Sequence, residues 1–150
     1  MKVRSAQISD AKVLTRNNIL LAAESEDMKL DPRTVLKGVK ALLSDEKKGF
    51  YIVAEEHGKV LGQLMITFEW SDWRNCMLWW LQSVYVEPAS RKKGVFKTLL
   101  KEVKKRAAKA KVSDLRLYVH TSNHKAMAAY KGTGFSQKPY LVYGRKGKDF

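Results

Sequence analysis

Four cations gather at the start of an amphipathic segment, where their type and spacing could bind an anion. They are Arg91, Lys92, Lys93 and Lys97. Apolar residues recur at helical spacing from Val95 to Val103, which predicts a helix that begins at this basic turn. A cation at a helix N-terminus costs about 0.3–1 kcal/mol, because that end of the macrodipole is positive. No acid before Glu102 offsets this conflict, so the sequence predicts a phosphate or pyrophosphate site here.

The residues around this turn match the sequence pattern of one known phosphate-binding loop and do not match the patterns of two others. The Walker pattern G-x-x-x-x-G-K-[ST] and the dinucleotide pattern G-x-G-x-x-G are both absent. Instead, an apolar strand ending at Val84–Val86 leads into Arg91-x-x-Gly94-x-Phe96. This arrangement resembles the [RQ]-x-x-G-x-[GA] pyrophosphate loop of the GNAT superfamily of N-acetyltransferases. The family has a Gly or Ala where this chain has Phe96.

A second segment is similar to a later motif of the same family. From Asn123 the chain reads NHKAMAAYKGTGF, which matches N-x-x-A-x-x-x-Y-x-x-x-G-[FM]. A capped amphipathic helix would also explain this segment, because Asn123 is a good N-cap. That alternative does not explain why both motifs occur in the family's order with one predicted strand, Leu115–Val119, between them. With the N-terminal strand and helix included, the resemblance covers essentially the whole chain.

The order of the expected elements defines the fold class. The chain has 150 residues and is 45% hydrophobic, which is enough for one domain with its own core. The apolar pattern from Met77 to Val86 is continuous rather than alternating, as expected for a strand in a sheet covered on both faces. The resemblance implies an α+β, GNAT-like fold with a mixed, mostly antiparallel sheet of six or seven strands and helices on both faces. The expected strands are 3–8, 50–55, 59–70, 77–86, 115–119 and a terminal pair near Phe135 and 140–144; the expected helices begin at Asp10, Pro32, Val95 and Asn123.

The composition of the chain limits where the protein is expected to be located and what it is expected to bind. No apolar run approaches the ~20 residues that a membrane helix needs, so no membrane association is expected. The single cysteine, Cys76, cannot form an internal disulfide, and together with a polar N-terminus unlike a signal peptide it predicts a cytoplasmic protein. The histidines and the cysteine lack metal-ligand spacing, so no metal is expected. The resemblance is compatible with a homodimer.

The strong positive charge leaves a second function open. The net charge is +14, and residues 91–111 carry ten lysines and arginines against one acid. A solvated helix face is the ordinary explanation, with attraction of polyanionic CoA as an addition. The rival hypothesis is a catalytically idle, basic module that binds nucleic acid or another partner. No helix-turn-helix, zinc-finger or RNA-binding aromatic motif accompanies the charge, which makes a nucleic-acid partner the weaker expectation.

The resemblance implies acetyl-CoA as cosubstrate and assigns residues to it. Phosphates would bind the basic loop, and the pantetheine amides would pair with the edge of the preceding strand, which in this family is bulged and splayed. A backbone N–H near Tyr85 or Val86 would polarise the thioester carbonyl. Tyr130, with an ordinary pKa of about 10, would protonate the leaving thiolate. The expected cofactor residues are Val84, Tyr85, Val86, Arg91, Lys92, Lys93, Gly94, Val95, Phe96, Lys97, Asn123 and Tyr130.

The acceptor side is predicted from an aromatic hairpin and from acidic residues. All four tryptophans fall between Trp70 and Trp80, with Glu69 and Asp72 among them. Tryptophan faces and carboxylates attract cations, which favours a small cationic amine as acceptor; the alternative is that two tryptophans are core and two cap the hairpin. The expected acceptor-binding residues are Glu24, Glu26, Trp70, Asp72, Trp73 and Trp79. The general base is expected among Glu24, Glu26, Glu69 and Asp72, with Glu24 and Glu69 preferred.

Overall fold

A five-stranded sheet is the centre of the structure, a computed structural model that describes residues 1–150 apart from the side chain of Asp149. The strands lie in the order β1-β2-β3-β4-β5. The first four pair antiparallel with their neighbours, whereas β5 pairs parallel with β4. Their bounds are Lys2–Ser5 for β1, Phe50–Glu56 for β2, Lys59–Ser71 for β3, Cys76–Val86 for β4 and Leu115–Leu117 for β5.

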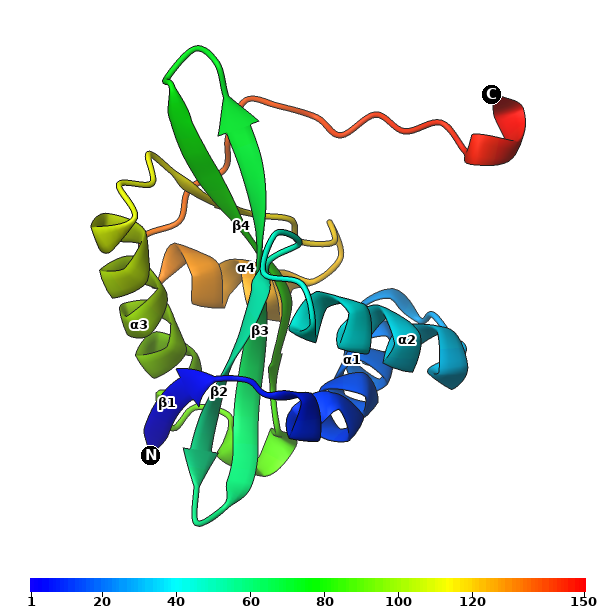
Figure 1. Ribbon diagram of the computed structural model, residues 1–150, viewed down its shortest axis with the longest axis vertical. Coiled ribbons are helices and arrows are strands. Elements are labelled where there is room, and N and C mark those ends of the chain that lie inside the picture. The colour runs from blue at the N-terminus through cyan, green and yellow to red at the C-terminus, as the bar shows by residue number, and fades with distance from the viewer. The chain divides into compact units, whose positions relative to one another are not determined.

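Helices lie on both faces of this sheet. The chain divides into two compact units, Met1–His120 and Thr121–Phe150. The first unit contains the sheet, and Figure 1 shows α3 on one face and the pair α1 and α2 on the other. The second unit contains α4. The helix bounds are Ala11–Glu26 for α1, Pro32–Leu43 for α2, Val95–Lys109 for α3 and His124–Lys131 for α4.

The predicted fold class is confirmed, with one difference in the number of strands. The sheet has five strands rather than six or seven, because residues 135–144, expected to supply a terminal pair, contain no strand. The segment is rich in β-forming residues, yet Tyr140 to Tyr143 remain exposed. High β-propensity alone does not form a strand, since each strand needs a neighbour to complete its ladder. The predicted strand 115–119 is also shorter, Leu115–Leu117.

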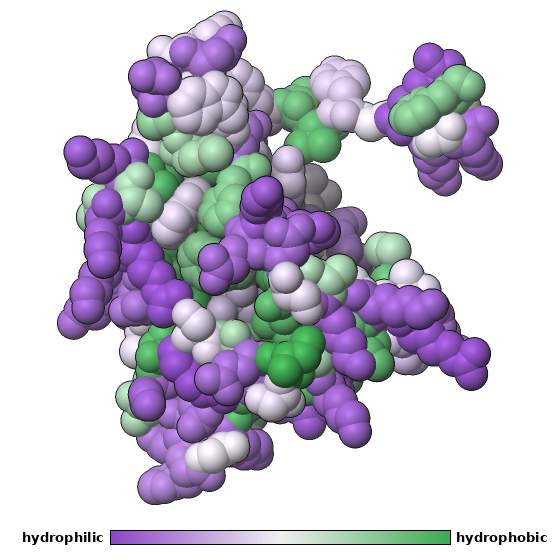
Figure 2. All heavy atoms as spheres, in the orientation of Figure 1, coloured by the Kyte–Doolittle hydropathy of each residue, from purple (hydrophilic) through white to green (hydrophobic). Residues whose placement is uncertain are grey.

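The spacing of apolar residues explains how the helices pack. Helix α2 begins with Asp31 as N-cap, whose carboxylate accepts a hydrogen bond from the Thr34 N–H at 2.9 Å. Its buried residues, Val39 and Leu42, join α1, β2 and β3 in one apolar cluster. Helix α3 buries one face against the sheet; the buried residues are Val95, Leu99, Leu100, Val103 and Ala107. The opposite face of α3 carries exposed lysines, and Figure 2 shows hydrophilic side chains on this side of the molecule.

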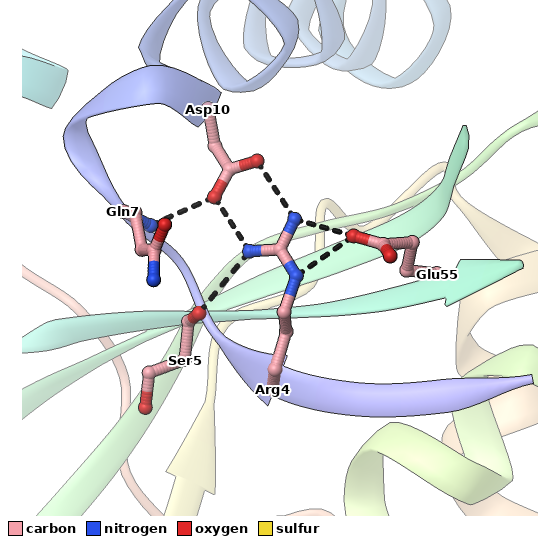
Figure 3. Close-up of polar contacts among 5 residues, drawn as sticks. All are labelled: Arg4, Ser5, Gln7, Asp10 and Glu55. Atoms are coloured by element: carbon pink, nitrogen blue, oxygen red, sulfur yellow. Dashed lines mark hydrogen bonds and ion pairs between the residues drawn. The ribbon is translucent and has the colours of Figure 1, made fainter. Parts of the chain in front are cut away.

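Asp10 is the N-cap residue of α1, as expected, but its side chain does not cap that helix. A 3-10 turn, Ile8–Asp10, precedes the helix, and the Asp10 carboxylate accepts a hydrogen bond from the Gln7 N–H at 2.7 Å. Figure 3 shows the same carboxylate paired with Arg4, at 2.7 and 3.0 Å, and Arg4 also bonded to Glu55 at 2.7 Å. The Arg4 guanidinium holds the pKa of Asp10 below its usual value of 3.8, despite burial. This cluster ties β1 and β2 to the beginning of α1.

Candidate functional site

A bulge interrupts β4 shortly before the basic loop. One residue of β3, Leu64, lies opposite two residues of β4, Ser83 and Val84, while regular pairing resumes on both sides. Ser83 has a φ of 50°, in the left-handed region that a residue with a Cβ rarely adopts. This two-against-one arrangement bends the strand and removes one residue from the ladder.

The same part of β4 also separates from β5. The parallel pairing of the two strands ends at Leu81 and Leu117, although β4 continues to Val86. In the described part of the chain, residues 82–86 therefore have no strand beside them on the β5 side. Backbone N–H and C=O groups on such an edge can pair with the amides of an extended ligand. The structure thus has the bulged and splayed edge that the resemblance implied.

The basic loop places the N-terminus of α3 next to open space. Gly94 is the N-cap residue of α3, has a φ of 79°, and provides no side-chain cap. A Cβ built at Gly94 would meet no atom within 4 Å, so the backbone here is accessible to a ligand. No acid lies in the first turn of α3, and the cations Lys92, Lys93 and Lys97 are exposed. These features fit a pyrophosphate bound to the helix N-terminus.

Close packing at Gly62 brings this loop to the bulged strand. A Cβ at Gly62 would lie 2.8 Å from the Val95 Cγ1 atom and 3.1 Å from the Tyr85 carbonyl oxygen. Only glycine permits that approach, which holds the first residue of α3 against β3 and β4. Val95 is therefore buried, and Phe96, which departs from the family pattern, is half-buried at the helix start.

Three residues from α1, β4 and the loop meet beside the bulge. The Tyr85 hydroxyl donates to Glu24 Oε1 at 3.3 Å, and the Arg91 guanidinium donates to Glu24 Oε2 at 2.6 Å. Arg91 also donates to the Val86 carbonyl oxygen at 2.9 Å and lies 5.5 Å from the centre of the Tyr85 ring. Burial, and then the Glu24 charge, raise the pKa of Tyr85, so its hydroxyl stays protonated and donates. One predicted base and three predicted cofactor residues are thus neighbours.

Negative charge concentrates at the end of α1. Glu24, Glu26 and Asp27 follow one another at the C-terminus of the helix, and its last turn contains no basic residue. Because that end of the macrodipole is already negative, three carboxylates there repel both the dipole and one another. Arg91 offsets part of this charge through Glu24. Glu26 is exposed and has no ion pair among the described residues.

The tryptophan hairpin does not converge on Glu24. Trp73 is 90% exposed at the tip of the β3–β4 hairpin, where its backbone N–H donates to Asp72 Oδ1 at 2.9 Å. Trp70 is also exposed at this end. From Cys76, beside the tip, to Ser83 the chain advances seven residues along β4. At about 3.3 Å per residue this is roughly 23 Å. The three residues form an exposed aromatic and acidic cluster of their own.

Trp79 and Glu69 lie in surroundings different from those expected. Trp79 is 7% exposed and packs against the rings of Phe50 and Phe68, with centroids 5.3 and 6.0 Å away. The structure therefore places Trp79 in the core, apart from the exposed tip residues Trp70 and Trp73. Glu69 lies on β3 towards the hairpin tip, with its carboxylate 3.7 Å from the Arg116 guanidinium. Neither residue is brought to the bulge.

The second unit holds the remaining predicted residues. The Asn123 side chain caps α4 by accepting from the Ala126 N–H at 3.1 Å. Tyr130 lies near the end of α4, and its ring meets the Phe135 ring edge-on at 6.1 Å. Burial raises the pKa of Tyr130, so its hydroxyl remains a proton donor at neutral pH. Roles for Asn123 and Tyr130 in cofactor binding stay predictions.

Sequence reasoning missed a buried amide pair beneath the bulge. Asn17 on α1 and Gln63 on β3 are both 0% exposed, and the Asn17 Nδ2 atom donates to Gln63 Oε1 at 3.0 Å. The available signal was a glutamine within the apolar run VLGQLMI, on a strand whose other residues predict burial. An amide on a buried face needs a partner, so the sequence could have marked Gln63 as one half of a buried polar pair without naming Asn17 as the other.

Other kinds of site find no support in the described residues. None of their His, Cys, Asp and Glu side chains form a group of three or more that could hold a metal ion. Their helices are also too short or too polar to cross a membrane.

The comparisons with known proteins identify the family. The model of the acetyltransferase (GNAT) family matches residues 17–135, and the chain belongs to this family. It is therefore an acyl-CoA N-acyltransferase, as the motifs predicted. A search of curated proteins gives no match.

Solved structures support the same conclusion. The crystal structure of a possible acetyltransferase from Clostridium difficile 630 has 40% sequence identity and a TM-score of 0.90, covering 97% of this chain and 96% of that one. A predicted acetyltransferase with acetyl-CoA from Clostridium acetobutylicum has 16% identity and a TM-score of 0.79, covering 96% and 95%. Aminoglycoside antibiotic 6'-N-acetyltransferase AAC(6')-IG from Acinetobacter haemolyticus has 18% identity and a TM-score of 0.77, covering 97% and 98%. The last two show likeness of fold only.

Proposed function

We propose that this enzyme transfers an acetyl group from acetyl-CoA to the primary amine of a small cationic molecule, by direct attack within a ternary complex. The observation that supports this most strongly is the position of Glu24. Its carboxylate is held beside the bulged edge of β4 by Tyr85 and Arg91, at 3.3 and 2.6 Å. A base that must act on an attacking amine has to lie within hydrogen-bond reach of it, directly or through one water.

The loop and the strand edge would hold the cosubstrate. The exposed cations of the loop and the N–H groups at Gly94 suit the phosphates, and the edge at residues 82–86 suits the pantetheine amides. Acetyl-CoA supplies the acetyl group as an activated thioester. Asn123 and Tyr130 complete the proposed set of cofactor residues.

Each proposed residue has one task in the transfer. Glu24 accepts a proton from the amine as the new N–C bond forms. A backbone N–H at the bulge donates to the carbonyl oxygen, where negative charge develops. Tyr130 donates its proton to the sulfur as the C–S bond breaks. The amine proton and the sulfur proton are thereby both accounted for.

The charge at the end of α1 favours a cationic acceptor. On a chain of net charge +14, Glu24, Glu26 and Asp27 form an acidic group at the negative end of a helix. A protonated amine group elsewhere on the acceptor would relieve their repulsion. Trp70, Asp72 and Trp73 lie too far along the hairpin to share a small acceptor with Glu24. We therefore limit the proposed acceptor site to Glu24 and Glu26.

A panel of amines, assayed by release of the CoA thiol, tests this function. The panel includes small di- and polyamines, monoamines and peptides with a free N-terminus, each at several concentrations. We expect the cationic small amines to give the highest kcat/KM. Release with peptides alone would contradict the proposed acceptor class. Salt-sensitive nucleic-acid binding with no release from any amine would favour the idle basic module instead.

Two neighbouring carboxylates provide a matched pair of variants. Glu24→Gln should lower kcat about 10²-fold, because it removes a base while keeping hydrogen-bonding capacity. Glu26→Gln removes the same charge from the same helix end, two residues away; as a change in proposed acceptor binding alone, it should raise the KM for the amine and keep most of the kcat. Equal kcat values for the two variants would exclude Glu24 as the base.

A further inference from the structure

A chain of buried amides runs from α1 to the bulge of β4. The Gln63 Nε2 atom donates to Asn18 Oδ1 at 2.8 Å and makes a longer contact, 3.4 Å, with the Ser83 carbonyl oxygen. Asn17 donates to the Gln63 oxygen at 3.0 Å, and Asn18 donates to the Tyr51 hydroxyl at 3.0 Å. The Gln63 amide is therefore held from both ends by residues of α1.

Burying such a network costs free energy, so its presence in the core suggests a role other than packing. Buried amides lose their hydration, and replacing a bonded pair by apolar residues of similar shape can be nearly neutral for stability. Packing therefore does not require Asn17 and Gln63 at these positions. Asn17 also accepts from Arg16, and Gln63 also donates to Asn18. Gln63 in addition contacts the carbonyl of Ser83, the one β4 residue with a φ of 50°. A strained residue persists where its surroundings over-determine its conformation.

The contact also fixes the direction of a backbone donor. All peptide bonds among the described residues are trans, so the C=O and N–H of each peptide unit point in opposite directions. Since the Ser83 carbonyl is turned towards Gln63, the Val84 N–H of the same peptide points away from Gln63. On the far side of β4 from β3, no strand is paired with Val84. The donor thus points away from the Gln63 side chain and the α1 face, at a position of β4 that has no strand paired on the β5 side.

We propose that Gln63 is a positioning residue, which fixes the Ser83–Val84 peptide so that the Val84 N–H donates to the carbonyl oxygen of the acetyl group. This inference rests on the proposed function, because it requires a thioester at the splayed edge. Asn17 and Asn18 act through Gln63 by setting the orientation of its amide. None of the three residues touches the reacting atoms.

The relative affinity for acetyl-CoA and CoA tests this role without any acceptor. Both ligands share the phosphates and the pantetheine, and only acetyl-CoA has the carbonyl oxygen. Titrations of the parent should give tighter binding of acetyl-CoA than of CoA. In Gln63→Met the ratio of the two dissociation constants should fall about fivefold, the value of one hydrogen bond. Affinity for CoA should change little. A second readout is kcat with the best amine, expected to fall at least ~10-fold while the KM for acetyl-CoA changes less.

Tyr51→Phe is the matched control. Tyr51 is buried and accepts from Asn18 at the other end of the same network, so its loss removes one buried hydrogen bond without touching Ser83. This variant should lose stability, seen as a lower melting temperature, but keep the affinity ratio and kcat. If Gln63→Met does not fold, Asn17→Leu combined with Gln63→Met removes both buried partners and preserves the apolar volume.

The outcomes separate this inference from the proposed function. A parent that binds neither acetyl-CoA nor CoA contradicts the proposed function itself. A parent that binds both equally, or a Gln63 variant with the parental ratio and kcat, overturns the positioning role alone. A Tyr51→Phe protein that loses the ratio as fully as Gln63→Met would show that general loosening of the core is the cause, which also overturns it.

Discussion

Substituting Gly94 by Ala should separate cofactor binding from backbone strain, because the chain contains a matched glycine. Gly94 has a φ of 79° and Gly58, in the β2–β3 turn, has a φ of 73°. A Cβ at either position would meet no atom within 4 Å. Both substitutions therefore carry the same penalty for a left-handed L-residue, about 1–2 kcal/mol, and no clash. For a domain of this size each should lower the melting temperature by roughly 2–8 °C.

Acetyl-CoA should distinguish the two variants. At about 100 times its dissociation constant it adds roughly 2.7 kcal/mol to the parent, a rise of about 5–11 °C in melting temperature. At Gly94 the new methyl group occupies space in which the phosphates are proposed to approach the backbone, and we expect about tenfold weaker binding. The same ligand concentration then adds only ~1.4 kcal/mol, or half the shift. Gly58→Ala should keep the full shift.

Differential scanning fluorimetry of the parent and the two variants, each with and without acetyl-CoA, measures all six melting temperatures. Inorganic pyrophosphate at the same concentration serves as an anion control. A Gly94→Ala protein with the full parental shift would refute the reasoning about the loop. So would a parent stabilised equally by pyrophosphate and acetyl-CoA, because the site would then recognise only charge.

Two further predictions concern single side chains. Tyr130→Phe should lower kcat about 10²-fold at unchanged acetyl-CoA affinity, since it removes a proton donor and keeps the ring; Tyr143→Phe, an exposed position in the same unit, should match the parent in a CoA-release assay. An unchanged kcat for Tyr130→Phe would assign the proton to another donor. Because Arg4 lowers the pKa of Asp10 below 3.8, Asp10 contributes stability above that pH, which is lost as the pH falls through the depressed pKa. Asp10→Asn should lower stability at pH 7 by about 1–3 kcal/mol. It should also flatten the loss of stability with acid below pH 3.8 in denaturant titrations, and an unchanged acid dependence would assign it to other carboxylates.

Much of the fold follows from residue spacing. The helical repeat from Val95 to Val103 and the continuous apolar run of β4 predicted their elements, because burial of one face or of both faces leaves a visible period. The phosphate loop was predicted for a similar reason. Its cations conflict with the helix dipole, and such a local conflict can be read from neighbours in sequence.

Contacts distant in sequence could not be predicted in this way. Gln63 and Asn17 are 46 positions apart, and nothing in either local pattern names the other as partner. The tryptophans show the same limit of prediction from sequence patterns. Trp73 and Trp79 share one hairpin and one residue type, yet one is 90% exposed and the other 7%. Trp73 lies in the turn at the hairpin tip, whereas Trp79 lies on β4 and packs against Phe50 and Phe68, which are distant from it in sequence.

The bulge at Ser83 has a consequence for how this family can diverge. Pairing between β3 and β4 is regular on both sides of the extra residue, so loss of a single codon there would restore an uninterrupted ladder. Every other strand residue would keep its neighbour, and the core would be conserved. The proposed backbone donor would be lost with the bulge. The shortest mutational path from an enzyme of this architecture to an inactive protein of the same fold is then one in-frame deletion, which leaves both sequence motifs intact.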